Sequence, residues 1–191
     1  VDPLEGTNFA AKDLPNAISV LAVTLKGNLL NAPETYMEKI AIGPGLPKNL
    51  VDLDFSVKKN IKLLSEAKNI EPNKLTACVL NRPRHDFIVN QLLEIGVNIN
   101  FITDGDVSGV ISVAYPKKNI DIYLGSVGVP EGFLSASSLK CLICQMQTRL
   151  FFHNDGEKAR AKKLGLEDLQ KKYNIDEMVK DDVIFCATGV T

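Results

Sequence analysis

Residues that could do chemistry are concentrated at the start of the sequence, in the stretch DPLEGT at positions 2–7. Asp2 and Glu5 are close enough along the chain to converge on one hard cation, which is how Mg²⁺ or Mn²⁺ is usually held beside a phosphate. Gly6 lets backbone approach a ligand closely, and Thr7 adds a hydroxyl beside free backbone amides. This combination is typical of metal-assisted phosphate chemistry.

The same stretch also has a simpler interpretation. Pro3 suits the first turn of a helix, so we expect Asp2 to sit where a strand ends and a helix or tight turn begins. Asp2 could then be a helix cap, Glu5 a first-turn carboxylate that favours the helix dipole, and Thr7 an ordinary polar residue. The local pattern leaves both interpretations open.

Further charged residues lie on predicted loops beside strands. Arg82 and Arg84 flank a proline that stiffens their loop, which suits guanidinium groups that hold a phosphate, although ion pairs with acids such as Asp86 are the alternative. The acids of the stretch DGD at 104–106 repel phosphate, so they form either a turn or a site for hydroxyls or a cation. Glu131 lies just before a predicted helix and is equally well a ligand or a helix-dipole residue.

Alternating strands and helices must position these loops. We predict strands at 18–25, 39–42, 75–80, 97–102, 120–124 and 183–187, and helices at 57–68, 85–95, 107–115, 133–147 and 155–172. The first of these strands should form a hairpin with residues 29–30 across a turn at 26–28. Strand, loop and helix then recur three times, which favours a mostly parallel sheet covered by helices, with ligands outside the carboxyl ends of the strands.

The sequence pattern changes near the breaker GPG at 43–45, where Pro47 also follows closely. We therefore predict an α/β protein of two parts, 1–46 and 47–191. The first part should carry a mixed sheet and is expected to be incomplete, because the chain begins within a motif. The second part should be a mostly parallel α/β domain whose last helix and strand pack back on the first.

Composition limits the partners. Apolar residues make up 45% of the chain, charged residues 24%, and the net charge is −1, which gives no electrostatic case for a nucleic-acid or membrane-surface partner. No apolar run approaches the ~20 residues that span a bilayer, and no leader-like segment opens the chain, so we expect a cytoplasmic protein. Cys141 and Cys144 lie in a predicted amphipathic helix, and we interpret them as core residues.

Seven short motifs together resemble one known family. In this order along the chain, they are similar to motifs of the class II fructose-1,6-bisphosphatases of the GlpX type, within the lithium-sensitive, metal-dependent phosphatases. These motifs are DPLEGT (2–7), NAPETYMEK (31–39), GPG (43–45), RPRHD (82–86), DGDV (104–107), GVPEG (128–132) and FCATGVT (185–191). The resemblance covers the whole chain and implies a layered sugar-phosphatase fold.

The resemblance also implies roles for individual residues. The metal ligands would be Asp2, Glu5 and Glu131, and the catalytic residues would be Thr7, Asp2 and Glu5. The substrate would be bound by Glu5, Gly6, Thr7, Tyr36, Arg82, Pro83, Arg84, Asp104, Gly105, Asp106 and Gly128. Relatives often carry a lysine at the position of Arg82, and they have an upstream segment with further metal-binding carboxylates that this sequence lacks.

The activity implied by the resemblance is hydrolysis of the 1-phosphate of fructose 1,6-bisphosphate to fructose 6-phosphate, a step of gluconeogenesis. It would need Mg²⁺ or Mn²⁺ and a water that attacks phosphorus in line. Sedoheptulose-1,7-bisphosphatase and inositol-phosphate phosphatase activity are the alternatives, together with a catalytically incomplete fragment. We expect a sugar bisphosphate as the substrate, and a homo-oligomer without nucleic-acid or membrane partners.

Overall fold

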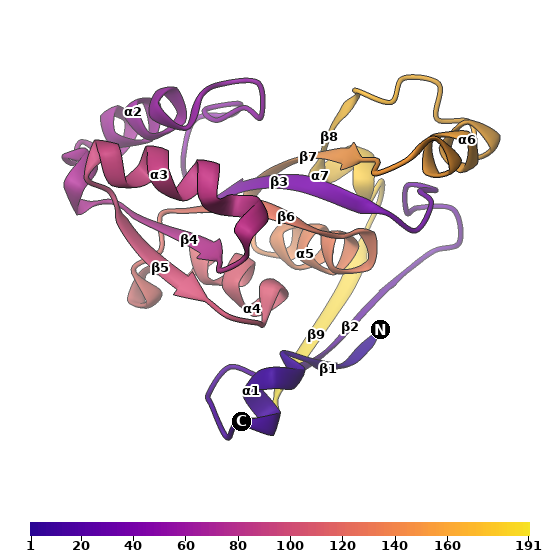
Figure 1. Ribbon diagram of the computed structural model, residues 1–191. Coiled ribbons are helices and arrows are strands. Elements are labelled where there is room, and N and C mark those ends of the chain that lie inside the picture. Colours follow the sequence, from indigo (N-terminus) through magenta and orange to yellow (C-terminus); the bar gives the residue numbers. More distant parts are fainter.

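The computed structural model describes residues 1–191, which form nine strands and seven α-helices (Figure 1). The strands are β1 (Asp2–Glu5), β2 (Ile18–Thr24), β3 (Tyr36–Ile42), β4 (Thr76–Leu80), β5 (Asn98–Ile102), β6 (Ile122–Gly128), β7 (Gln145–Phe151), β8 (Lys172–Asn174) and β9 (Val183–Gly189). The helices are α1 (Thr7–Ala11), α2 (Val57–Lys68), α3 (Asp86–Ile95), α4 (Asp106–Ile111), α5 (Val129–Cys141), α6 (Asp155–Lys163) and α7 (Ile175–Met178).

The strands form two sheets. The larger sheet has the strand order β5-β4-β6-β3-β7-β8, and the smaller one has the order β1-β2-β9. Strand β4 is parallel to both β5 and β6, whereas β3 is antiparallel to β6 and β7, and β7 is antiparallel to β8. The predicted α/β class is confirmed, and parallel pairing is confined to β5, β4 and β6.

Helices cover both faces of the larger sheet (Figure 1). On one face α2 and α3 bury Ile61, Leu64 and Leu92 in an apolar cluster with strand residues. On the other face α4 and α5 contribute Val110 and Leu139 to a second cluster. The smaller sheet packs on the outer side of α4 and α5, where Val20, Val107 and Leu134 are buried together. The chain is thus layered as helices, sheet, helices and sheet.

Local signals explain where α2 begins and where α3 ends. The Ser56 hydroxyl accepts a hydrogen bond from the Lys59 amide at 3.2 Å and caps α2, which spans residues 57–68 as predicted. Helix α3 ends at Gly96, whose φ of 81° is the left-handed conformation that glycine adopts without steric cost. These helices flank β4 and so fix the loop of residues 81–85.

The predicted hairpin of residues 18–25 with 29–30 is wrong. Strand β2 pairs instead with β1 on one side and β9 on the other. Residues 26 and 27 do form a turn, but the chain after it leaves the sheet, and the Leu30 amide donates to the Met178 carbonyl at 2.9 Å. The β-branched residues of β2 therefore pair with a strand at the other end of the sequence.

Two predicted helices are too long. The helix expected to reach residue 147 ends at Cys141, because Ile143 adopts a left-handed φ of 55° and reverses the chain into β7. In β7 the buried residues alternate, with Met146, Thr148 and Leu150 inside, which is a strand period. The helix expected to reach residue 172 ends at Lys163, just before the left-handed Gly165.

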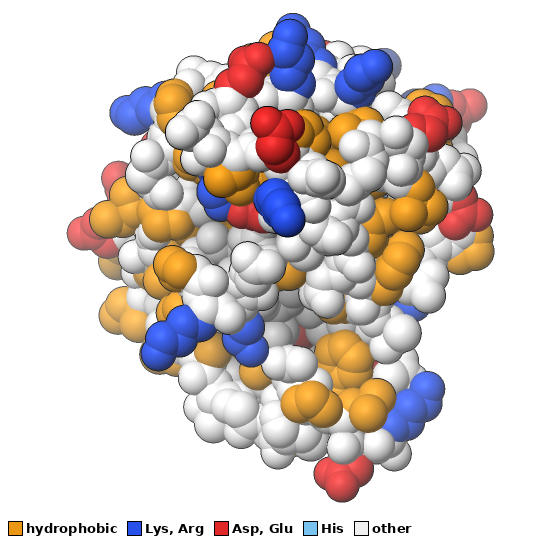
Figure 2. Space-filling view, turned by 90° about the vertical axis from the view of Figure 1, so that its left-hand side faces the viewer, with side chains coloured by type: hydrophobic (Ala, Val, Ile, Leu, Met, Phe, Trp, Pro, Cys, Tyr) orange, Lys and Arg blue, Asp and Glu red, His pale blue; other side chains and the backbone are white.

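The proposed division near residue 46 remains a prediction. Strand β3 lies before that point but is hydrogen-bonded between β6 and β7 in the larger sheet, and β9 from the end of the chain pairs with β2. The face in Figure 2 carries acidic and basic side chains interspersed among apolar ones. None of the helices combines the length and apolar character needed to cross a bilayer.

Candidate active site

One cavity of about 420 Å³ gathers almost all the residues predicted to act on a ligand. All of the predicted site residues except Pro83 and Gly105 line it: Asp2, Glu5, Gly6, Thr7, Tyr36, Arg82, Arg84, Asp104, Asp106, Gly128 and Glu131. Leu4, Leu80 and Val127 add apolar lining that the sequence did not suggest. Residues that are far apart in the sequence, from Asp2 to Glu131, therefore meet in one place.

The turn between β1 and α1 places the first acids. Asp2 is the first residue of β1 and pairs with Val20, so the expectation that it would sit at the end of a strand is wrong. One oxygen of Asp2 accepts a hydrogen bond from the Leu4 amide at 3.0 Å. The chain turns after Glu5, where Gly6 adopts a φ of 84° that favours glycine, and α1 begins at Thr7.

Glu5 is the most buried acid of the cavity, with 5% of its surface exposed. Its Oε1 accepts a hydrogen bond from the Val107 amide at 3.0 Å, while Oε2 is buried without a partner. Burial raises the pKa of Glu5 to about 7, and the nearby charges of Asp106, Asp2 and Asp104 act in the same direction. A bound cation would relieve both the unpaired oxygen and the repulsion between carboxylates.

The start of α4 lies beside this turn. Asp104 accepts a hydrogen bond from the Asn8 amide at 2.8 Å, which holds α1 against α4. Gly105 packs on the ring of Phe9 so closely that an added Cβ would lie 2.5 Å from it. Asp106 was predicted to lie on a loop and to contact a sugar, but it is the first residue of α4 and is buried, with its carboxylate engaged by other side chains. Asp104 is the more accessible acid.

Glu131 reaches the cavity from the start of α5. The predicted loop at 125–132 is wrong, since β6 extends to Gly128 and continues directly into α5. Glu131 lies in the first turn of this helix, and its carboxylate covers Gly128, where an added Cβ would lie 2.5 Å from Oε2. Glycine at 128 therefore leaves room for the acid.

The three acids predicted to bind metal share the cavity, but their oxygens are not clustered. No group of three Asp, Glu, His or Cys side chains is close enough to hold one ion in this structure. Asp2 is hydrogen-bonded to its own strand and Glu131 lies over its own helix start, which keeps them apart. The donor set of carboxylate oxygens, with Glu5 Oε2 unpaired, nevertheless suits a hard divalent cation.

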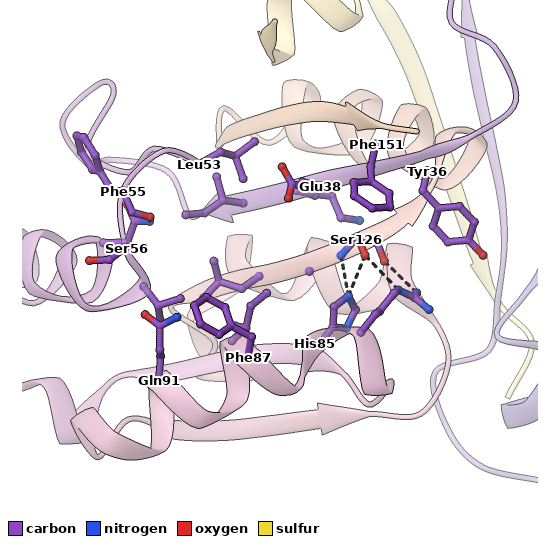
Figure 3. Close-up of a pocket in the computed structure, with 18 of the residues that line it drawn as sticks. Tyr36, Glu38, Leu53, Phe55, Ser56, His85, Phe87, Gln91, Ser126 and Phe151 are labelled. Carbon is purple, nitrogen blue, oxygen red and sulfur yellow. Dashed lines mark hydrogen bonds between the residues drawn. The ribbon is translucent and has the colours of Figure 1, made fainter. Parts of the chain in front are cut away.

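Arg84 forms a wall of the cavity together with Tyr36. Its Nε donates to the Ser126 hydroxyl at 3.1 Å and its Nη2 donates to the Ser126 carbonyl at 3.0 Å (Figure 3). The guanidinium carbon lies 5.4 Å from the centre of the Tyr36 ring. Tyr36 precedes the strand predicted at 39–42, but in the structure it begins β3, which is three residues longer. Arg84 makes no ion pair with Asp86 or any other acid, so its charge is available to an anion.

His85 contacts Ser126, the residue that anchors Arg84. The ring nitrogen Nδ1 lies 2.7 Å from the Leu80 carbonyl, and Nε2 accepts a hydrogen bond from the Ser126 amide at 2.9 Å. Burial lowers the pKa of His85, and the neighbouring Arg84 charge lowers it further. The imidazole is therefore neutral near pH 7 and holds the serine that anchors Arg84.

A second cavity of about 410 Å³ lies on the other side of this wall (Figure 3). It shares Tyr36 and Arg84 with the first cavity, but its walls are mostly apolar. Its largest apolar side chains are Leu53, Phe55, Phe87, Ile88 and Phe151, from the loop before α2, from α3 and from β7. No motif indicates this cavity, because its lining residues lie on several elements.

Sequence reasoning also missed two buried residues, Lys39 and Tyr123. Both contact Asp106, which lines the carboxylate-lined cavity. One signal was present. Lys39 lies on the same face of β3 as Met37 and Ala41, which are buried in an apolar cluster. A lysine among apolar residues on a buried strand face is unusual.

Comparisons with known proteins identify one family. A family model described as bacterial fructose-1,6-bisphosphatase, glpX-encoded, matches residues 1–191. A protein of Synechococcus sp. (strain JA-3-3Ab) named D-fructose 1,6-bisphosphatase class 2/sedoheptulose 1,7-bisphosphatase is 36% identical over all of this chain and 58% of its own length. A protein of the same name from Trichodesmium erythraeum (strain IMS101) is 35% identical over all of this chain and 59% of its own length. The chain thus spans less than two thirds of these relatives.

Proposed function

This chain belongs to the family of bacterial, glpX-encoded fructose-1,6-bisphosphatases, and from that premise we propose that its cavity hydrolyses the 1-phosphate of fructose 1,6-bisphosphate. The products would be fructose 6-phosphate and inorganic phosphate. The activity is proposed for the full-length protein, because the chain covers only 58% of a curated relative. The proposal rests on one observation: the cavity combines Asp2, Glu5 and Glu131 with the guanidinium of Arg84, which forms no ion pair.

The acids and the arginine suit the two ends of a sugar bisphosphate. Asp2, Glu5 and Glu131 would hold a divalent cation such as Mg²⁺ or Mn²⁺, which would neutralise charge on the reacting phosphate and on the leaving oxygen. Arg84 would bind the distal phosphate through its planar guanidinium, and Arg82 would add a second positive charge. Asp104 would accept hydrogen bonds from sugar hydroxyls, since a carboxylate disfavours a phosphate at that position.

Thr7 would act on the attacking water. Its hydroxyl, at the start of α1, would accept a hydrogen bond from the water and orient the oxygen toward phosphorus. The new phosphorus–oxygen bond would form as the bond to the sugar oxygen breaks, and a proton would pass to that oxygen. Gly6 leaves the backbone beside the phosphate free of side chains.

Sedoheptulose 1,7-bisphosphate is a second candidate substrate. The names of the relatives include both activities. A cavity that binds both phosphates of a sugar bisphosphate need not distinguish sugars that differ by one carbon. We propose both substrates for the same residues.

Phosphate release by the full-length protein tests the proposal. Fructose 1,6-bisphosphate, sedoheptulose 1,7-bisphosphate and an inositol monophosphate would each be assayed with Mg²⁺, with Mn²⁺ and with a chelator. We expect release from the bisphosphates only when a divalent metal is present. Failure to release phosphate from either bisphosphate, or full activity in excess chelator, would contradict the proposal. Light scattering on the same sample would test the expected homo-oligomer.

A further inference from the structure

A lysine is completely buried beneath the carboxylate-lined cavity. The side chain of Lys39 has no exposed surface, and it extends from the face of β3 that also carries Met37 and Ala41. An ammonium group is rarely buried without a counter-charge, because removing it from water is costly. The contacts of Lys39 therefore indicate what it does.

Lys39 is paired with Asp106 and also contacts two uncharged side chains. Its ammonium donates to one oxygen of the Asp106 carboxylate and to the Ser135 hydroxyl, the latter at 3.2 Å. It also lies over the ring of Tyr123, 4.6 Å from the ring centre. The Tyr123 hydroxyl donates to the other oxygen of Asp106. Both oxygens of this buried carboxylate are thus satisfied from below the cavity.

These contacts join the two helices that carry cavity residues. Asp106 begins α4, and the next amide in the chain, that of Val107, donates to Glu5 Oε1 at 3.0 Å. Ser135 lies four positions after Glu131 on α5, which places both residues on the same face of that helix. The ammonium of Lys39 therefore touches the helix that orients Glu5 and the helix that carries Glu131.

Stability alone does not account for this arrangement. Replacing a buried ion pair with apolar residues of similar volume is often neutral or stabilising, because both charges must be removed from water. The core around Lys39 already contains apolar residues, such as Met37 and Val110. A charged pair at this position instead fixes one geometry, since it joins a definite oxygen of Asp106 to a definite strand.

We propose that Lys39 is a positioning residue that fixes the start of α4 relative to the middle of α5, so that Glu5 and Glu131 face the same cavity. This role rests on the proposed function, because it matters only if these two acids act together on a cation. Lys39 itself would touch neither the substrate nor the metal.

The test compares two lysines in the full-length protein. Lys39→Met removes the buried ammonium at similar volume, and Lys68→Met is the matched control, because Lys68 forms an ion pair with the buried Asp121 outside the cavity. Mn²⁺ affinity, kcat and KM are measured for each variant. We expect Lys39→Met to weaken Mn²⁺ binding by about tenfold or more, as loss of a supporting residue does, and to lower kcat. Lys68→Met should stay within about twofold of the wild type in Mn²⁺ affinity.

The direction of the change in Mn²⁺ affinity distinguishes displacement of the acids from loss of the lysine charge. Loss of a positive charge near a group of carboxylates would by itself strengthen cation binding, so weaker binding reports displaced ligands. Unchanged or tighter Mn²⁺ binding by Lys39→Met would overturn the proposed role. If the wild type neither bound Mn²⁺ nor hydrolysed the bisphosphate, the proposed function would fail and this role with it. Wild-type binding with an unaffected Lys39→Met variant would overturn only the role of Lys39.

A second variant covers the case in which Lys39→Met does not fold. The double variant Lys39→Met with Asp106→Asn removes both charges and leaves no uncompensated buried ion, so it should fold. The net charge of the pair is zero before and after the change. Mn²⁺ binding weakened by about tenfold in this variant would support the role. An Mn²⁺ affinity equal to that of the wild type would show that the Lys39–Asp106 pair is not needed to place Glu5 and Glu131.

Discussion

The two neighbouring cavities have nearly the same size but different linings. Their volumes are about 420 and 410 Å³, and both include Tyr36 and Arg84. One gathers the carboxylates of Asp2, Glu5 and Glu131, whereas the other is lined largely by aromatic and aliphatic side chains. Cavity size therefore does not separate the two, and the proposed reactive site rests on the convergence of charged groups in one of them.

The cavities also differ in how the fold builds them. The carboxylate-lined cavity is formed by the ends of elements: the turn after β1, the starts of α1 and α4, and the junction of β6 with α5. The apolar cavity is formed by the sides of elements, including one face of β3 and one side of α3. Element ends carry free backbone groups and tolerate polar side chains, so a reactive site is more easily built there.

The largest effect should come from the carboxylate-lined cavity. We expect Glu131→Ala in the full-length protein to lower kcat for fructose 1,6-bisphosphate by on the order of 10³-fold, because a lost ligand removes charge stabilisation from the transition state. The thermal transition should persist, since a first-turn carboxylate contributes about 1 kcal/mol or less to stability. Glu94→Ala, an exposed acid on α3, is the matched control and should keep full activity. A near-normal kcat for Glu131→Ala would make Glu131 a structural residue.

Arg84 belongs to both cavities, so its substitution tests which of them uses it. We expect Arg84→Ala to lower kcat/KM for the bisphosphate by on the order of 10²-fold, which matches the upper range of about 3 kcal/mol for a charged hydrogen bond. Hydrolysis of a simple monophosphate ester should change much less, because it has no distal phosphate. Arg160→Ala on α6 serves as the control. Equal losses for both substrates would place Arg84 at the reaction centre or in the fold.

The next effect concerns pH and Glu5. Its pKa is raised to about 7 without metal, so it is increasingly protonated as pH falls below 7. A metal ligand must be deprotonated, and apparent Mn²⁺ affinity should therefore fall by about tenfold per pH unit below 7 and level off above it. Mn²⁺ titrations between pH 5.5 and 8 would measure this dependence. A flat profile would mean that Glu5 is not a ligand.

The smallest effect is expected in the apolar cavity. The Phe87 side chain lines it and is 74% exposed, so Phe87→Ser should change kcat/KM by less than about twofold and stability by about 0.5 kcal/mol or less. Phe101→Ser, on β5 outside both cavities, is the matched control. A tenfold loss confined to Phe87→Ser would show that the apolar cavity takes part in the reaction and would remove the contrast between the two.

Much of the fold follows from local signals, and the failures at β2 and β7 share one cause. The cap at Ser56 and the glycine at 96 act over a few residues, so the limits of α2 and α3 could be predicted. The first three residues of β7, 145–147, were predicted as helix because the partner strand, β3, lies about a hundred residues earlier. Strands β2 and β9 were both predicted, but their pairing was not, because they lie at opposite ends of the sequence. Non-local pairing overrides local preference.

The candidate site divides in the same way. The resemblance of seven motifs to one family was enough to select residues that line one cavity, because motifs on loops and helix starts converge at element ends. Burial was not predictable. Nothing local distinguishes Asp104, which is partly accessible, from Asp106, which turns into the core to meet Lys39. That difference depends on where β3 and α4 pack, which the sequence specifies only through the whole fold.

The pairing of β2 with β9 has a consequence for the order of assembly during synthesis. Ala17 and Thr191, hydrogen-bonded beside this pairing, are 174 positions apart, and such long closures are slow steps in folding. Strand β1, with Asp2 and Glu5, is held only through β2, whose other edge is empty until β9 arrives. On the ribosome, Asp2 and Glu5 would thus reach their final places only after residues 183–189 have emerged. We therefore expect the carboxylate-lined cavity to stay incomplete on the nascent chain until β9 docks.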